Sequence, residues 1–132
     1  MNDGRLLQVN PGCDELSGLS FILGFHESSS GIVWIATRNG LFAYSPKENT
    51  LKRYTVASGL PSNVINGIEE DSYGRLWLST DNGLSCHNPY SGVFRNFTVK
   101  DGLPSRQFSM GSHCRLDSGR MYFGGIRGIT TF

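Results

Sequence analysis

The sequence predicts an all-β fold made of repeated units of four short strands. Seventeen of the 132 residues are glycine and 11% are aromatic, which indicates many tight turns between short strands. The same landmark residues return at a fixed spacing along the chain, which is typical of a repeat architecture. No segment shows a 3.6-residue apolar period long enough for a helix.

The repeat appears when residues 21–63 are aligned with residues 64–107. Every matched pair is then 43 positions apart. The pairs are Gly31 with Gly74, Trp34 with Trp77, Thr37 with Thr80, Asn39-Gly40-Leu41 with Asn82-Gly83-Leu84, Pro46 with Pro89, and Gly59–Ser62 with Gly102–Ser105. A third copy starts at Phe108 with a spacing of 45, shown by Gly119, Tyr122 and Gly128. We attribute its two extra residues to a longer preceding loop, at Arg106 and Gln107.

Each copy predicts four strands, which in the second copy are residues 64–69, 76–80, 84–87 and 93–98. Asp71 can bond back to the first turn while Gly74 takes a left-handed conformation. Asn82-Gly83 predicts a tight hairpin, because both residues tolerate a positive φ. We expect Trp34, Trp77 and Tyr122 to open the second strands and to pack between adjacent sheets.

Four strands in 40 to 45 residues are typical of one β-propeller blade. We therefore assign residues 21–63 and 64–107 to two blades and residues 108–132 to a partial last blade. Residues 1–20 are expected to be the end of a preceding blade or a connecting strand. Within them, Gly4–Val9 is expected to be the last strand of that blade or a strand that pairs with the unfinished third blade. Closed propellers need more blades. We therefore expect an incomplete propeller, a fragment that needs the remaining blades, and self-association through its uncovered faces.

Composition and motifs argue against several function classes. A net charge of +1 gives no basic surface for nucleic acid or for direct membrane contact, and the longest apolar run, Ile32–Ala36, is too short to span a membrane. Three cysteines (Cys13, Cys86 and Cys114) and three histidines match no metal-site spacing, so we expect no metal, no cofactor and buried or half-buried free thiols. The N-terminal residues lack the basic region followed by an apolar region that is typical of a signal peptide.

Antiparallel strands place the second-to-third turns and the blade-to-blade loops at one end of the sheets. This end carries the candidate ligand-binding residues Arg38, Asn63, Asp81, Arg106 and Arg127. Ordinary solvated turn residues are the alternative explanation for each of them. We expect no catalytic residues: Ser79 and Ser85 lack a nucleophile motif, and Glu69 and Glu70 should point to opposite faces of a strand. For these two glutamates and Asp71 we expect solvated or turn-capping roles.

The segment Glu70-Asp71-Ser72-Tyr73-Gly74-Arg75-Leu76-Trp77-Leu78-Ser79-Thr80-Asp81-Asn82-Gly83-Leu84 resembles the two-component regulator propeller repeat. The first copy matches from Gly31 to Leu41 but has Ser28 at the position of Asp71, which weakens its turn signature. The third copy, Gly119–Phe132, resembles the last blade of such propellers.

The resemblance implies the periplasmic sensor region of a hybrid two-component system, an inner-membrane-anchored protein with a histidine kinase. Many such sensors respond to oligosaccharides released from polysaccharides. No position of this chain matches the kinase, receiver or DNA-binding parts, so the resemblance implies a non-catalytic share of the ligand-sensing surface. A protein-protein interaction scaffold is the alternative, because propellers also bind proteins on this face.

Overall fold

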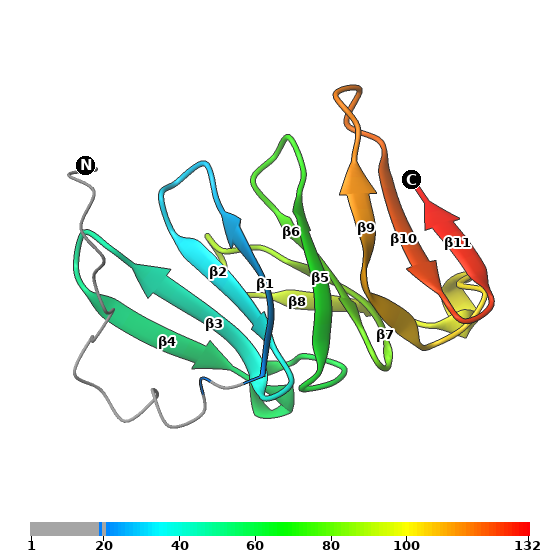
Figure 1. Cartoon of the computed structure of the whole chain (residues 1–132), viewed down its shortest axis with the longest axis horizontal. Helices are drawn as coiled ribbons and strands as arrows, with labels where there is room; N and C mark the ends of the chain where they lie inside the picture. The colour runs from blue at the N-terminus through cyan, green and yellow to red at the C-terminus, as the bar shows by residue number, and fades with distance from the viewer. Residues whose placement is uncertain (1–18, 20) are drawn as a thin grey trace.

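The computed structural model describes residue 19 and residues 21–132, and these form three antiparallel sheets (Figure 1). We name the sheets blade 1, blade 2 and blade 3. In chain order, their strands are β1 (Ile22–Glu27), β2 (Val33–Thr37), β3 (Gly40–Ser45) and β4 (Thr50–Tyr54); β5 (Ile65–Glu70), β6 (Leu76–Thr80), β7 (Gly83–His87) and β8 (Phe94–Phe97); and β9 (Phe108–Arg115), β10 (Met121–Gly125) and β11 (Gly128–Thr131). The predicted all-β fold is confirmed, with a third blade of three strands.

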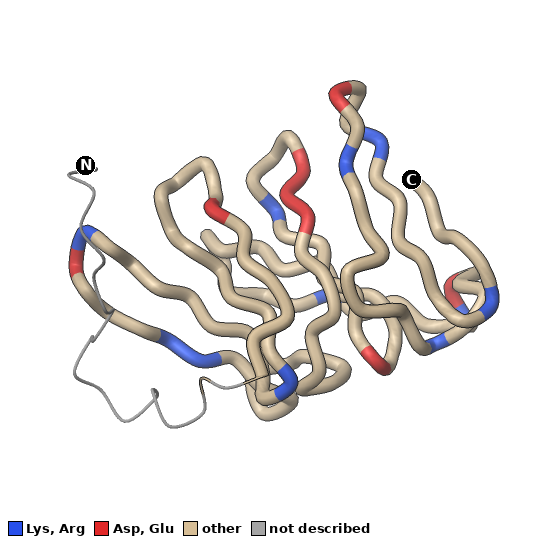
Figure 2. The backbone as a smooth tube through the Cα atoms, in the orientation of Figure 1, with Lys and Arg blue, Asp and Glu red and all other residues tan. Residues whose placement is uncertain are grey.

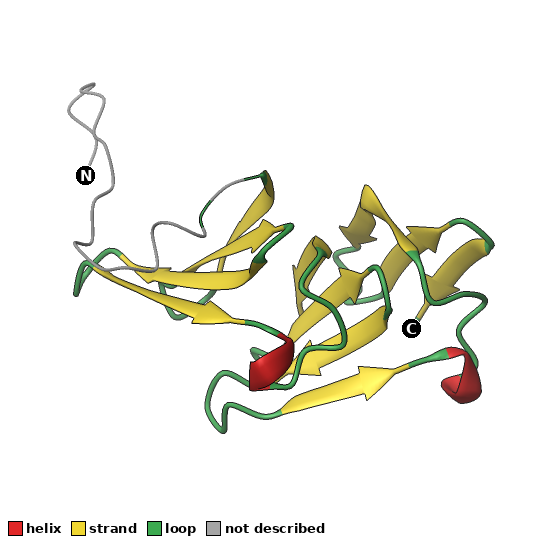
Figure 3. Ribbon diagram, turned by 90° about the horizontal axis from the view of Figure 1, so that it is seen from below, coloured by secondary structure: helices red, strands yellow, loops and turns green. Residues whose placement is uncertain are grey.

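The strands of each blade pair in sequence order, and the first strands of the three blades lie side by side (Figure 1). β5 contacts β1 on one side and β9 on the other. The helical elements in the described part of the chain are two single 3₁₀ turns, η2 (Val56–Ser58) and η3 (Val99–Asp101), at the blade-to-blade connections (Figure 3). None of the described helices is long and apolar enough to cross a membrane.

Both connections repeat the same local structure, which explains the repeated Gly-Leu-Pro-Ser motif. Thr55 caps η2 and Thr98 caps η3, each through a reciprocal capping box. Gly59 and Gly102 end these turns in the left-handed conformation, with φ of 118° and 102°. The same backbone path therefore links each blade to the next.

Two of the three hydrophobic cores in the described part of the chain lie between the blades. One core joins Trp34 and Leu41 of blade 1 to Ile68 and Leu78 of blade 2. The next joins blade 2 to blade 3 around Phe108 and packs against Trp77, as expected for an aromatic residue between sheets. Since these two cores each need two blades, packing against neighbouring blades is a main source of their stability. The third core, Ile35, Phe42 and Leu51, lies within blade 1.

The two tryptophans pack on equivalent aromatic partners. Trp34 packs on Tyr54 at a ring-centroid distance of 5.9 Å, and Trp77 packs on Phe97 at 5.7 Å. Both tryptophans are the second residue of their strand, as is Tyr122, so the expectation that these residues open the strands is wrong by one position. Tyr122 faces no further blade among the described residues.

The two extra residues of the third copy lie in β9, so their predicted place in the preceding loop is wrong. Phe108 pairs with Gly125 as Ile65 pairs with Thr80, which shows that the first strands still start 43 positions apart. The register then shifts, and His113 pairs with Phe123 as Ile68 pairs with Leu78. The irregular stretch 109–112 includes Gly111 with a φ of 72°, a conformation that favours glycine.

The cysteines only partly follow the expectation. Cys86 is a buried free thiol and Cys114 is an exposed one, because Cys114 lies on the uncovered face of blade 3. Burial raises the pKa of the Cys86 thiol. Cys13 and the expected strand Gly4–Val9 lie outside the described residues.

Candidate functional site

The second-to-third turns and the blade-to-blade connections gather at one end of the sheets. We name this end the loop face; it consists of turns 38–39, 81–82 and 126–127 with connections 55–64 and 98–107, at the bottom of Figure 1. Two equivalent hydrogen bonds hold it together. The Gly40 amide donates to the Asn63 carbonyl at 2.6 Å, and the Gly83 amide donates to the Arg106 carbonyl at 2.5 Å. Each hairpin turn is thereby tied to the connection that leaves its own blade.

A pocket of about 510 Å³ opens on the loop face between blades 2 and 3. Three of the five predicted site residues line it: Asp81 from blade 2, Arg106 from the connection and Arg127 from blade 3. Neither arginine forms an ion pair among the described residues, and both are exposed. Their guanidinium groups are therefore available to a ligand in the pocket.

Arg38 lies elsewhere on the loop face. It lines a second hollow of about 310 Å³, which runs along the starts of the first strands and also includes Asp81. Asp81 thus borders both hollows, while Arg38 does not line the pocket that contains Arg106 and Arg127.

Asn63 has a structural partner. Its Oδ1 accepts a hydrogen bond from the Val56 amide at 2.8 Å, which holds η2 against the end of the same connection. Neither hollow is lined by Asn63. Arg106 occupies the equivalent position one blade later, where its side chain lines the pocket.

Asn66 is a residue of this site that the sequence analysis missed. It is buried, and its Nδ2 donates to Asp81 Oδ1 at 2.8 Å and to the Phe108 carbonyl at 2.9 Å. It sits where the register shifts between Ile65 and Gly67, so its side chain fixes Asp81 and links blade 2 to blade 3. A polar residue at the start of a buried strand was the available signal.

The charged residues of the chain lie mainly at the two ends of the sheets (Figure 2). Two guanidinium groups and one carboxylate line the pocket between blades 2 and 3. Such a set can form several directed hydrogen bonds to hydroxyl or carboxylate oxygens. In the part of the chain that the structure describes, no group of three or more His, Cys, Asp or Glu side chains could hold a metal ion.

The rejected nucleophile candidates are buried. Ser79 and Ser85 are both fully buried, and Ser85 Oγ donates to Asn96 Oδ1 at 2.7 Å. Neither serine lines the pocket on the loop face. Their burial excludes them from contact with a bound substrate.

Glu69 and Glu70 point to opposite sides of β5, as expected, but the expected solvated or turn-capping role is wrong. Glu70 binds His26 of blade 1 with Oε1 2.9 Å from Nε2, and Glu69 binds His113 of blade 3 with Oε2 2.5 Å from Nδ1. Partial burial of Glu70 opposes its ionisation, but hydrogen bonds from His26 and Ser29 outweigh it and hold its pKa below the ordinary value. The two carboxylates therefore bind neighbouring blades together.

Asp71 organises the first turn of blade 2. Its carboxylate accepts hydrogen bonds from the amides of Tyr73 and Arg75, from Arg75 Nε at 2.7 Å and from Trp77 Nε1 at 2.9 Å. Burial opposes ionisation here too, but these bonds outweigh it and lower the pKa of Asp71. The turn-capping role expected for Asp71 is confirmed.

Comparison with known proteins agrees with this architecture. Residues 59–82 match the model of the two component regulator propeller family. No curated protein sequence matches the chain. Among solved structures, the extracellular domain of BT3049 from B. thetaiotaomicron, described as a hybrid two component system, matches 91% of the chain with a TM-score of 0.82 and 29% identity.

Two further structures share the fold at lower identity. The extracellular domain of BT4673 from the same organism matches 83% of the chain with a TM-score of 0.69 and 21% identity. Virginiamycin B lyase from Staphylococcus aureus matches 84% with a TM-score of 0.62 and 21% identity. The chain covers 17%, 15% and 40% of the lengths of these three structures, in the order given. The resemblance of the repeat to the two-component regulator propeller family is thereby confirmed.

Proposed function

We propose that the chain is part of an extracytoplasmic, non-catalytic sensor propeller of a hybrid two-component system, and that it contributes to the recognition of a polysaccharide-derived oligosaccharide. The observation that carries this proposal is the convergence of Asp81, Arg106 and Arg127, from blades 2 and 3, on one pocket of about 510 Å³. The extracytoplasmic location that we propose is supported by the match to the BT3049 domain, which is described as extracellular.

The chemistry of the pocket suits a hydrated, oxygen-rich ligand. Exposed guanidinium groups donate several hydrogen bonds in a fixed plane, and the Asp81 carboxylate, oriented by Asn66, accepts from hydroxyl groups. The pocket lies across two blades, so a ligand bound there contacts both. A bound ligand would stabilise one relative arrangement of blades 2 and 3. This shift in conformation would be the signal that the sensor transmits.

The experiment is calorimetric titration of the chain with neutral and acidic oligosaccharides, followed by Arg106→Ala and Arg127→Ala. Loss of a hydrogen bond to a charged group should weaken binding about tenfold to a hundredfold. Arg120→Ala is the matched control, since Arg120 is an exposed arginine at the other end of the sheets. Binding that survives both pocket substitutions unchanged would show that the site lies elsewhere.

The rival scaffold function is tested in the same preparation. Oligosaccharides that leave no calorimetric signal, together with a partner protein whose binding is lost in Arg106→Ala and Arg127→Ala, would favour it. Hydrolysis or elimination products in the sugar titration would instead contradict the non-catalytic assignment.

A further inference from the structure

A second groove opens at the opposite end of the sheets, between blades 1 and 2. We name this end the turn face; it consists of the turns 28–32, 46–49, 71–75 and 88–93. The groove has a volume of about 340 Å³, within the range of small-ligand sites. Its lining combines aromatic rings with polar and charged side chains, among them Trp34, Tyr54, Tyr90, Lys52, Glu48 and Glu70.

The Trp34 side chain in this groove has an unsatisfied donor. Trp34 is only 3% exposed, and its Nε1 has no hydrogen-bond acceptor among the described residues. A buried N–H without an acceptor is unfavourable, because it has lost its hydrogen bonds to water. An oxygen atom brought to this nitrogen by a ligand would supply the missing acceptor.

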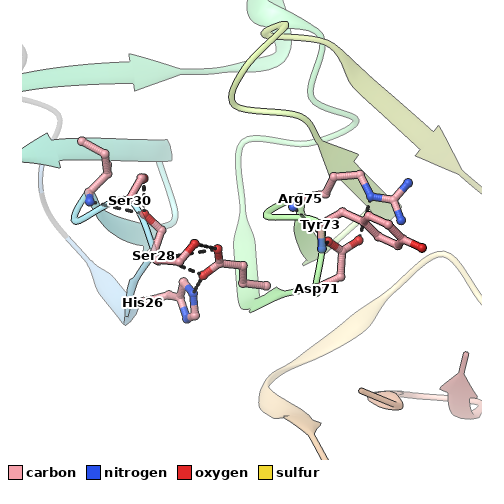
Figure 4. A network of polar contacts seen from close by, with 9 residues as sticks. His26, Ser28, Ser30, Asp71, Tyr73 and Arg75 are labelled. Carbon is pink, nitrogen blue, oxygen red and sulfur yellow. Dashed lines mark hydrogen bonds and ion pairs between the residues drawn. The ribbon is translucent and has the colours of Figure 1, made fainter. Parts of the chain in front are cut away.

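The equivalent tryptophan of blade 2, Trp77, has the hydrogen-bond acceptor that Trp34 lacks. Trp77 Nε1 donates to the Asp71 carboxylate, but blade 1 has Ser28 at that position. Ser28 Oγ accepts from the Ile32 amide at 3.3 Å and bonds to Ser30 Oγ at 2.8 Å. Figure 4 shows the two turns, with Ser28 and Ser30 in one and Asp71 and Arg75 in the other. The shorter serine therefore satisfies its own turn and leaves the indole without an acceptor.

The charges of the groove select against an anionic ligand. Two carboxylates, Glu48 and Glu70, line it together with one ammonium group, Lys52. A ligand carboxylate would meet this excess of negative charge, whereas neutral hydroxyl groups can donate to Glu48 and accept from Lys52. Tyr90 is 79% exposed at the rim, so its ring can stack on the apolar face of a sugar ring.

We propose that this groove binds a neutral, hydroxyl-bearing ring of the pyranose class, with one ligand oxygen accepting the Trp34 indole N–H. Trp34 Nε1 is covered in this structure, so binding requires movement of side chains above it. Lys52 and Tyr90 are exposed and can change rotamer. This proposal depends on the proposed function only for the class of ligand. The site itself is independent of it, because the groove lies at the other end of the sheets from Arg106 and Arg127.

The test uses the two indole N–H signals of the ¹⁵N-labelled chain, which has two tryptophans. Titration with cellobiose, maltose and lactose should shift the Trp34 signal with at least one sugar and leave the Trp77 signal in place. Ser28→Asp supplies the carboxylate that blade 2 already has, so it should abolish the shift. Tyr90→Ala should weaken binding roughly tenfold.

Tyr73→Ala is the matched control, because Tyr73 is 76% exposed in a neighbouring turn and does not line the groove. The proposal is overturned if none of the three sugars moves the Trp34 signal, if Ser28→Asp retains the shift, or if glucuronate binds and the neutral sugars do not. A Trp34 shift that persists in Arg106→Ala and Arg127→Ala supports this site whatever happens on the loop face. Arginine-dependent calorimetric binding without a Trp34 shift would leave the proposed function standing and remove this inference.

Discussion

The imidazole ring of His87 packs against Trp34 just as the ring of Phe132 packs against Trp77 one blade later. The ring-centroid distances are 5.5 Å and 4.5 Å. His87 is fully buried and also stacks on Phe94 at 4.1 Å, so this histidine acts as an apolar aromatic ring. Burial lowers its pKa from the ordinary 6.5 to about 4.

This burial predicts an acid-sensitive step in stability. The unfolded chain binds a proton at His87 near pH 6.5, and the folded chain does so only near pH 4. The stabilisation is therefore fully present above pH 6.5 and is lost as the pH falls toward 4, by about 3 kcal/mol in total. Urea unfolding at pH 7.0, 6.0, 5.0 and 4.5 measures it.

His87→Phe gives blade 2 the residue that blade 3 has at the equivalent position, Phe132. This substitution should remove most of the pH dependence of stability. Asp71 and Glu70, whose pKa values lie below their ordinary values of 3.8 and 4.5, lose their contributions only at lower pH. An unchanged slope between pH 7.0 and 4.5 in His87→Phe would show that other groups cause the acid sensitivity.

Asp71→Ser should destabilise the chain by about 2 kcal/mol. The substitution copies the Ser28 turn of blade 1 into blade 2, where it leaves Trp77 Nε1 without its acceptor and removes the partner of Arg75. Denaturant titration followed by tryptophan fluorescence measures the loss. Asp117→Ser is the control, since Asp117 is exposed in the corresponding turn of blade 3. Equal stabilities of the two variants would contradict the central role of Asp71.

Gly67→Ala should disrupt the contact between blades 2 and 3. A methyl group at Gly67 would collide with the His113 ring, which binds Glu69 beside it. The expected loss is about 1–3 kcal/mol. Gly24→Ala is a matched control one blade earlier, because nothing lies within 4 Å of a methyl group there. Thermal unfolding of both variants tests the pair, and a Gly24→Ala variant that melts lower would contradict it.

The repeat made the main features of the fold predictable. The 43-residue spacing, the Asn-Gly turns and the aligned Trp34 and Trp77 depend on local chemistry and on neighbouring blades of the same kind. The position of the two-residue insertion in β9 was not predictable. Two extra residues can be placed in a loop or in an irregular strand, and the sequence alignment does not distinguish the two places. The strand register in the structure shows the place of the insertion, through the pairing of Phe108 with Gly125.

The candidate site was only partly predictable. Antiparallel topology correctly brought Asp81, Arg106 and Arg127 to one end, because this requires only the strand order. The side-chain partners were not predictable: Asn63 bonds to Val56, and Asn66 links Asp81 to blade 3. Such contacts depend on the distance between blades and on rotamers, which a repeat alignment does not specify.

The last prediction concerns the face of blade 3 that points away from blade 2. Tyr122, at the position of Trp77, lines a hollow there with Cys114 and Ile129, and Ile129 is 71% exposed. In blade 2 the corresponding face is covered by blade 3 and contributes to a core. We therefore expect reversible self-association of the chain, because contact between copies would remove this apolar surface from water. Sedimentation velocity over a hundredfold range of concentration should show it.

Ile129→Asp should shift the chain to monomer, because a charged side chain would have to be desolvated in the contact. Ile126→Asp is the matched control: Ile126 is 65% exposed, but it lies on the loop face. Association that weakens equally in both variants would place the contact elsewhere or make it non-specific. A chain that stays monomeric at every concentration would show that the apolar area around Tyr122 is too small to drive association in water. The selective effect of Ile129→Asp would instead identify this face as the surface on which a further blade, or another copy of the chain, packs.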